Sequence, residues 1–301
     1  MKTLKYLPPL AVVTAAVLWS FDGLLRQNLA SVSSFLVILL EHIIGAILFI
    51  PFLIKGWAEI KNLSQRVWIS VMWVAVFGGI IGTFFYTKAL SYIGFIDLSV
   101  VVLLQKFQPL FAIALAAVIL REPLTRQYLT YAAIAVVGGY LVTFGNGMPT
   151  FSANDATLIA SLMALCAAFA WGSSTVLGKH ALGHLSFFTL TSLRLWVTSI
   201  VAGAIFFALP DRPDPTALSG NEWLFILAIA LSTGSVALFI YYYGLKHIPA
   251  THATIYELFW PLSAVLIDWL IRGRLLAPSQ MIGGILLVAA SVLLSQNSKN
   301  S

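Results

Sequence analysis

The sequence is poor in charged residues. Only 9% of its 301 residues are charged, whereas soluble domains carry about 25%. Hydrophobic residues make up 60% of the chain. A soluble protein of this length needs polar side chains to cover its surface, and this sequence has too few of them. We therefore expect most of the surface to face lipid, which makes the chain an integral membrane protein.

Other features that the sequence lacks exclude several functions. Cys166 is the only cysteine, so no intrachain disulfide can form. The net charge is +6, but no basic stripe with interleaved aromatics is present, and we expect no nucleic-acid partner. The segment from Gly172 to Lys179 resembles a phosphate-binding loop, but its spacing is one residue too long and His180 follows it. No protease or zinc motif occurs, so we expect no enzymatic activity, no cofactor and no metal.

Apolar runs of about 20 residues, each long enough to cross a bilayer as a helix, account for most of the chain. We expect ten such transmembrane helices. They fall near residues 7–26, 34–54, 67–88, 95–119, 124–144, 155–178, 185–209, 222–245, 250–271 and 276–295. Lys and Arg in the loops concentrate on the side of the N-terminus, although Arg272 and Arg274 fall on the other side. We therefore expect both termini in the cytoplasm.

The second half of the sequence resembles the first at an offset of about 150 residues. The matched segments are Trp19-Ser20-Phe21 with Trp171-Gly172-Ser173, 86–90 with 241–245, 107–110 with 259–262, and Gly138-Gly139 with Gly283-Gly284. Each half, residues 1–148 and 149–301, is expected to hold five helices, an odd number, so the halves insert in opposite orientations. Inverted repeats support alternating access around a central site. We predict an all-α transporter with two inverted five-helix repeats around a central cavity.

The sequence also carries mid-helix prolines, Pro109 and Pro261, and the run Arg121-Glu122-Pro123-Leu124. With these residues and the repeated tryptophans, the chain resembles the EamA-type branch of the drug/metabolite transporter superfamily. The corresponding run in the second half, 272–276, lacks the glutamate. The resemblance implies a secondary transporter of the bacterial inner membrane that exports amino acids or similar small polar metabolites through a cavity between the halves.

Four charged side chains fall well inside predicted spans, namely Glu41, Lys106, Arg194 and Glu257. Charges in hydrocarbon are costly unless they are paired or hydrated. One interpretation is two buried ion pairs, Glu41 with Lys106 and Arg194 with Glu257, that hold helices in register. The other is a direct role in solute binding or in coupling to a proton. Lys106 is the predicted contact for a solute carboxylate.

A further acidic residue, Asp22, lies three residues after Trp19 in the first predicted helix. It either lines the cavity or pairs with Arg26 near the outer interface. These two interpretations stay open at the level of the sequence.

Aromatic and amide side chains at repeated positions, or beside the charged groups, complete the predicted solute site. They can stack on an amphipathic solute and form a few hydrogen bonds with it. The predicted substrate-binding residues are Trp19, Tyr86, Gln105, Lys106, Gln108, Trp171, Tyr242, Tyr243, Tyr256, Glu257 and Trp260. Pro109 and Pro261 are the predicted hinges, because a mid-helix proline removes a backbone hydrogen bond.

Two other functions stay open at this stage. If Lys106 and Arg194 both face the cavity, uptake or exchange of an anionic metabolite is favoured. A membrane receptor or scaffold that transports nothing is the alternative from another class. The expected partners are the lipid bilayer and a small-molecule solute, with a proton as the candidate coupling ion. The oligomeric state is not predicted.

Overall fold

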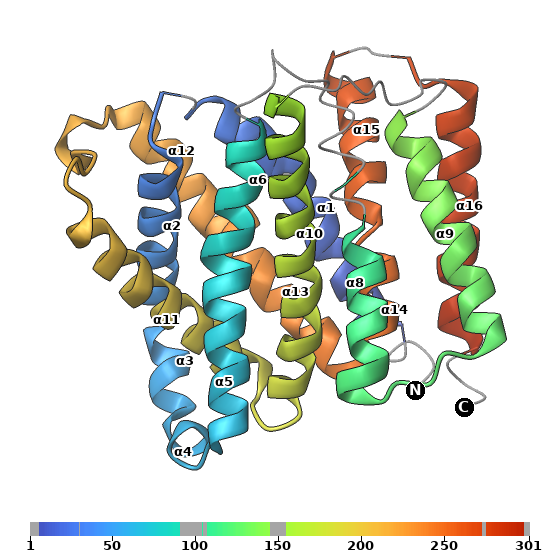
Figure 1. Ribbon diagram of the computed structural model, residues 1–301, viewed down its shortest axis with the longest axis horizontal. Coiled ribbons are helices and arrows are strands. Elements are labelled where there is room, and N and C mark those ends of the chain that lie inside the picture. The colour runs from blue at the N-terminus through green and yellow to red at the C-terminus, as the bar shows by residue number, and fades with distance from the viewer. Residues whose placement is uncertain are drawn as a thin grey trace.

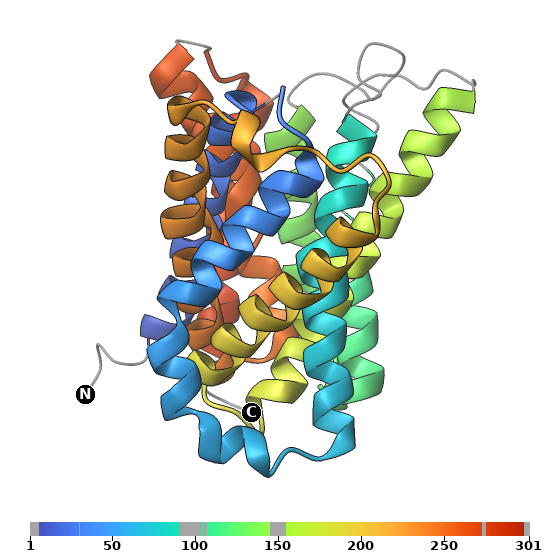
Figure 2. The ribbon, with the colours of Figure 1, turned by 90° about the vertical axis from the view of Figure 1, so that its left-hand side faces the viewer.

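The computed structural model of the chain describes residues 6–29, 31–90, 104, 107–144, 155–272 and 275–297. Every regular element within these ranges is a helix, as the long apolar runs predict. Most of the long helices run from one end of the molecule toward the other (Figure 1). The start of α1 and the end of α16 lie at the same end, the lower one in Figures 1 and 2, which we call the inner end.

The elements up to residue 144 are α1 (Leu7–Gln27), α2 (Ser34–Leu48), α3 (Ile50–Lys55), α4 (Trp57–Lys61), α5 (Gln65–Trp73), η2 (Val74–Ile81), α6 (Gly82–Leu90), α8 (Gln108–Leu115), η3 (Ala116–Leu120) and α9 (Arg126–Phe144). The later elements are α10 (Asp155–Leu182), α11 (Phe187–Ala208), η4 (Pro215–Ala217), α12 (Gly220–Ile229), η5 (Ala230–Gly234), α13 (Ser235–His247), α14 (Ala250–Tyr256), α15 (Phe259–Arg272) and α16 (Pro278–Asn297).

Six helical segments of the described residues are long and apolar enough to cross a bilayer. They are Leu7–Arg26, Gln65–Tyr86, Arg126–Phe144, Ile159–Leu182, Phe187–Ala208 and Gly220–His247. Three shorter apolar helices accompany them, at Ser34–Leu48, Gln108–Leu120 and Pro278–Leu294. Residues 95–103, 105 and 106 of the predicted span 95–119 lie outside the described residues, and the predicted span 250–271 is divided into α14 and α15. The total of ten spans therefore stays a prediction.

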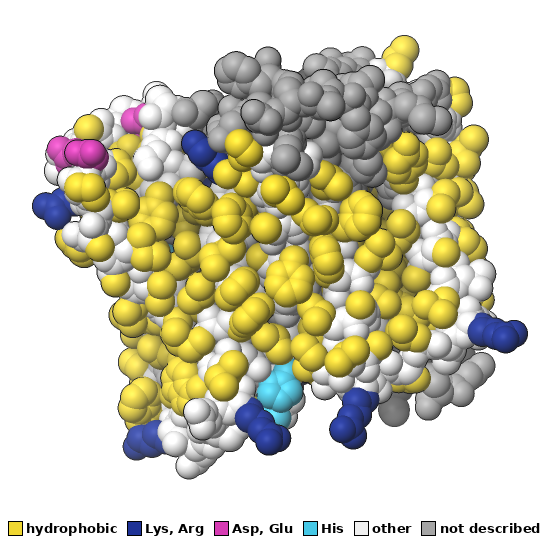
Figure 3. Space-filling model, in the orientation of Figure 1, with side chains coloured by type: hydrophobic (Ala, Val, Ile, Leu, Met, Phe, Trp, Pro, Cys, Tyr) yellow, Lys and Arg dark blue, Asp and Glu magenta, His cyan; other side chains and the backbone are white. Residues whose placement is uncertain are grey.

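The face of the molecule drawn in Figure 3 is apolar around its middle and carries its charged side chains toward the two ends. On the face drawn in Figure 3, hydrophobic side chains form a broad band, and most of the visible Lys and Arg side chains lie along the inner end. Large apolar side chains such as Val118 and Phe207 are 78% and 73% exposed. A surface of this kind is stable against lipid and unstable against water.

Two predicted spans that correspond in the repeat are interrupted by π-helical turns. In the span Gln65–Tyr86 the π-helix is η2, and in the span Gly220–His247 it is η5. A π-helical turn holds one residue more than an α-helical turn, so it rotates the helix that follows, and such turns are frequent at functional sites. Both interruptions precede the helices α6 and α13, which carry tyrosines of the site described below.

The helices α9 and α16 pack closely against each other. A Cβ atom added to Gly138 would lie 2.7 Å from the carbonyl oxygen of Gly283, and one added to Gly283 would lie 2.6 Å from that of Gly138. Only glycine allows this approach, so the repeated glycines that the sequence shows serve helix packing.

Both candidate hinge prolines lie near the start of a helical segment. Pro109 is the second residue of α8, and Pro261 is the third residue of α15. Pro261 has no N–H for the carbonyl of Glu257, and the N–H of Trp260 donates to that carbonyl instead, at 3.0 Å. This accounts for the break between α14 and α15. That the two prolines act as hinges stays a prediction.

Candidate solute-binding site

Aromatic side chains from three helices meet within the bundle. The ring centroids of Tyr86 on α6 and Trp171 on α10 are 5.4 Å apart, and those of Tyr86 and Trp260 on α15 are 6.5 Å apart. All three side chains are partly exposed. We call these three residues the aromatic surface. It brings together three of the side chains that the sequence predicts for the solute site.

A carboxylate lies three residues before Trp260, at the break between α14 and α15. Glu257 accepts hydrogen bonds from the hydroxyl of Tyr241 at 2.6 Å and that of Thr175 at 3.3 Å, and from Nε2 of Gln108 at 2.7 Å. Its side chain is partly exposed. These donors come from α13, α10 and α8, so the carboxylate joins four helical segments.

Trp19 joins this group through Tyr241. The two ring centroids are 5.2 Å apart, and Tyr241 is buried while Trp19 is partly exposed. Tyr242 and Tyr243 of this helix are predicted site residues, whereas Tyr241, which binds Glu257, is not among those predicted. Successive residues of a helix point about 100° apart, so only one of three adjacent tyrosines can face Glu257, and the sequence does not tell which.

Arg194 and Glu257 do not form the predicted ion pair. Nη1 of Arg194 donates to the hydroxyl of Tyr242 at 2.9 Å, whereas Glu257 binds the neighbouring Tyr241. The two charged groups therefore lie on different sides of α13, each with a tyrosine hydroxyl. The prediction was wrong because it used only the depth of the two charges in the bilayer. The rotation of each helix about its axis also decides which side chains face one another.

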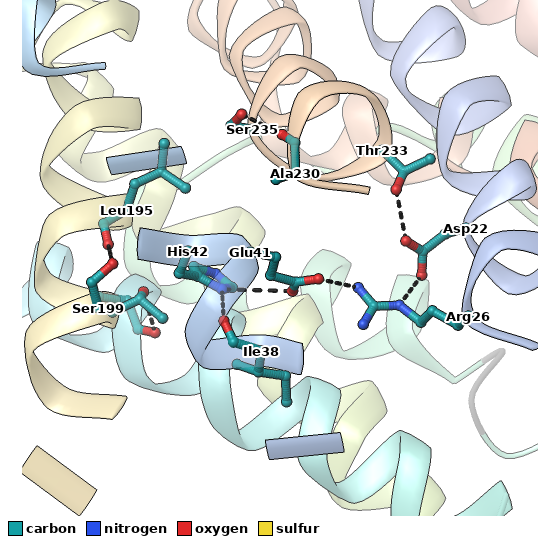
Figure 4. A network of polar contacts seen from close by, with 12 residues as sticks. Asp22, Arg26, Ile38, Glu41, His42, Leu195, Ser199, Ala230, Thr233 and Ser235 are labelled. Carbon is teal, nitrogen blue, oxygen red and sulfur yellow. Dashed lines mark hydrogen bonds and ion pairs between the residues drawn. The ribbon is translucent and has the colours of Figure 1, made fainter. Parts of the chain in front are cut away.

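The other predicted pair, Glu41 with Lys106, stays a prediction because Lys106 lies outside the described residues, but Glu41 has a partner among them. Glu41 binds Nη2 of Arg26 at 2.7 Å, and Arg26 also pairs with Asp22 through Nε. Thr233 of η5 donates to Asp22 at 2.7 Å. Figure 4 shows this network, in which α1 supplies Asp22 and Arg26, α2 supplies Glu41, and η5 supplies Thr233. Of the two interpretations of Asp22, pairing with Arg26 is confirmed.

Of the remaining predicted site residues, the structure describes Tyr243 and Tyr256 but not the other two. Gln105 and Lys106 lie outside the described residues. Tyr243 packs against Phe187, with ring centroids 5.4 Å apart, away from Glu257. Tyr256 is 3% exposed.

At the inner end, acidic side chains from the first half of the chain bind helix starts in the second half. Glu122 accepts from the backbone N–H groups of Ala250 and Thr251 at 2.7 and 2.9 Å, and from the hydroxyl of Thr251 at 2.7 Å. Glu59 accepts from the N–H and the hydroxyl of Ser186 at 2.7 and 3.0 Å. Negative charge at a helix N-terminus is favourable. Glu59 is not among the predicted residues, because nothing in the sequence around α4 indicates this contact.

Two lysines complement these contacts by binding backbone carbonyls at the end of α13 and in the loop between α10 and α11. Nζ of Lys179 donates to the carbonyls of Leu245 and Lys246, both at 2.9 Å, and Nζ of Lys246 donates to that of Leu185 at 2.7 Å. The inner end is therefore held by charged side chains bound to the ends of helices.

Among the described residues there is no group of three or more His, Cys, Asp and Glu side chains placed to hold a metal ion. His180, spaced four residues from His184, contacts the hydroxyl of Ser70 through Nδ1 at 2.9 Å.

The EamA-like transporter family matches the chain twice, over residues 7–144 and 158–296. The chain belongs to this family. Its membership confirms the resemblance drawn from the sequence, and the apolar helices make this EamA-like transporter a multi-pass integral membrane protein. The repeated match agrees with the duplication seen in the sequence.

Individual relatives of the EamA-like transporter are also known. It is 40% identical to the riboflavin transporter ImpX of Fusobacterium nucleatum over 291 residues, which cover 95% of this chain and 97% of that one. It is 24% identical to the uncharacterized transporter YoaV of Bacillus subtilis over 186 residues, 62% of each chain. A protein of known crystal structure, 19% identical, covers 98% of this chain with a TM-score of 0.75, which shows a shared fold.

Proposed function

We propose that this EamA-like transporter is a secondary transporter that carries riboflavin or a closely related flavin across the bacterial inner membrane. The relative that is 40% identical over nearly the whole chain is named as a riboflavin transporter. Identity at this level over the full length supports a related solute.

The aromatic surface is the observation that carries this proposal. A flavin is a planar system of three fused rings with a chain of hydroxyl groups. Tyr86, Trp171 and Trp260 offer rings on which such a system can stack. Glu257 and Gln108 lie next to this surface and can exchange hydrogen bonds with hydroxyl groups.

Movement of the solute is proposed to follow alternating access. In this account residues 1–148 and 149–301 form two five-helix halves, inserted in opposite orientations, that rock around the aromatic surface. The contacts of Glu59 and Glu122 join these halves at the inner end. They must break when the site opens toward the cytoplasm, and Pro109 and Pro261 are the proposed points of bending. A proton carried by Glu257 is the proposed coupling ion.

Amino-acid export, which the sequence analysis expects, is the competing proposal. The same preparation separates the two. Purified protein is titrated with riboflavin, and quenching of flavin fluorescence reports binding; unlabelled amino acids are then added as competitors. Saturable quenching that amino acids do not reverse supports flavin transport. No quenching by riboflavin, together with thermal stabilisation by an amino acid, refutes it.

A further inference from the structure

Arg194 is a cation inside the membrane-spanning bundle that has no anionic partner among the described residues. It lies within the span Phe187–Ala208, its Nη1 donates to Tyr242, and its guanidinium carbon is 5.8 Å from the centroid of the Tyr242 ring. Its Nε is buried and has no hydrogen-bond partner. The ion pairs of the described part of the chain all involve Arg26 or Glu41, so no described carboxylate neutralises Arg194.

An unpaired charged group inside the bilayer has a high free-energy cost. Charged side chains in the bilayer interior normally pair with one another or face a pathway for ions or solutes. A buried donor without an acceptor adds a further desolvation cost. One neutral hydroxyl group does not balance the charge of a guanidinium. The remaining N–H groups of Arg194 can therefore bind electron-rich oxygen atoms that do not belong to the described residues.

Two glycines place Arg194 beside the aromatic surface. A Cβ atom added to Gly78 would lie 3.1 Å from Nη2 of Arg194 and 2.8 Å from Oγ of Ser174. A Cβ atom added to Gly82 would lie 2.5 Å from Nε1 of Trp171. Gly78 and Gly82 are about one helical turn apart, as are Ser174 and Trp171. The guanidinium therefore lies about one turn along the same helix seam from the indole of Trp171.

We propose that Arg194 and Tyr242 form a subsite that binds paired carbonyl oxygens at one edge of the transported ring system, and this rests on the proposed flavin transport. One edge of the flavin ring carries two carbonyl groups flanking an N–H. A guanidinium presents several N–H donors in one plane, which matches paired oxygen acceptors better than a lysine ammonium does. The aromatic surface would hold the faces of the rings while Arg194 fixes which edge points toward it.

The test compares two planar ligands. Lumiflavin has the flavin rings with both carbonyl groups and no hydroxyl chain. Acridine has three fused rings without a carbonyl group, and it is uncharged at mildly alkaline pH. Binding of each ligand, and of riboflavin, is measured by fluorescence titration of the purified full-length protein and of Arg194→Gln. The exposed Arg126 provides the matched control, Arg126→Gln, which removes one positive charge far from the site.

The proposal predicts that Arg194→Gln raises the Kd for lumiflavin and riboflavin about tenfold to hundredfold, the range of hydrogen bonds to a charged group. Acridine binding and the Arg126→Gln protein should be unchanged. Arg194→Lys should bind flavin more tightly than Arg194→Gln but less tightly than the native protein, and Tyr242→Phe should weaken flavin binding several-fold. These two variants test the proposal if Arg194→Gln does not fold.

Other results overturn the proposal. An equal loss for acridine and lumiflavin would show that Arg194 only supports the fold. Unchanged flavin affinity would remove Arg194 from the site. If inorganic phosphate competes with riboflavin in the native protein but not in Arg194→Gln, the subsite binds free anions instead. Failure of the native protein to bind any flavin refutes the proposed function itself, which separates that outcome from failure of this subsite.

Discussion

The link between the halves at the inner end gives the sharpest structural prediction. Glu122 accepts three hydrogen bonds from the start of α14, two from backbone N–H groups and one from the hydroxyl of Thr251. Replacing it by alanine leaves these donors to water. We expect Glu122→Ala to loosen α14 and to favour opening of the inner end.

The magnitude follows from the contacts. Removal of a helix N-cap side chain costs about 0.5–2 kcal/mol, and hydrogen bonds to charged groups contribute about 1.5–3 kcal/mol each. The freed N–H groups can bind water, which offsets part of this cost. We therefore expect the substitution to lower the free energy that stabilises the start of α14 by about 2–3 kcal/mol in total. That corresponds to a rise of about 30- to 150-fold in the local opening equilibrium.

Hydrogen exchange measured by mass spectrometry tests this prediction on peptides that cover residues 249–256. Glu122→Ala should speed exchange there by the factor given above, whereas Glu122→Gln, which keeps one acceptor oxygen, should have a smaller effect. Glu222 is the matched control: it completes a capping box with Ser219 near the outer end. Glu222→Ala should leave residues 249–256 unchanged. Equal exchange of this segment in the native protein and in Glu122→Ala refutes the reasoning.

Three further predictions concern the site and the ion-pair network. Trp171→Ala should weaken riboflavin binding about 5- to 150-fold in a fluorescence titration, because stacking on one aromatic ring contributes about 1–3 kcal/mol; Trp57→Ala, at the surface, is the control and should bind normally. Glu257→Gln should still bind riboflavin but no longer respond to an imposed pH gradient in liposomes, because an amide carries no exchangeable charge; an unchanged response would exclude Glu257 from coupling. Arg26→Gln leaves two carboxylates without their cation and should destabilise the protein by about 3–5 kcal/mol, seen as a lower thermal midpoint. Glu41→Gln added to it should restore part of the loss, and no restoration would contradict the pairing.

The apolar spans could be predicted from the sequence because they depend on local composition, and the family could be predicted because its repeated residues can be seen in the sequence. A bilayer requires long apolar helices whatever their neighbours are. The tryptophans at repeated positions, Trp19 and Trp171, also contact tyrosines of the candidate site, Tyr241 and Tyr86 respectively. Repetition marks positions that matter to the architecture, and it needs no knowledge of helix rotation.

The partners of the charged side chains could not be predicted in the same way. An in-membrane charge indicates that a partner is needed, but Glu41 binds Arg26, and Arg194 faces Tyr242 instead of Glu257. The π-helical turn η5 rotates α13 relative to a continuous α-helix. The directions in which the tyrosines of α13 point therefore cannot be obtained from a period of about 3.6 residues per turn along the span. Contacts between distant segments, such as Glu59 with Ser186, leave no local signal in the sequence.

The most direct test of the account is riboflavin flux into liposomes that contain the purified protein. The account predicts saturable movement of riboflavin that exceeds that of empty liposomes, falls in Trp171→Ala, and is not competed by amino acids. Flux equal to that of empty liposomes, with the protein folded and inserted, would contradict it.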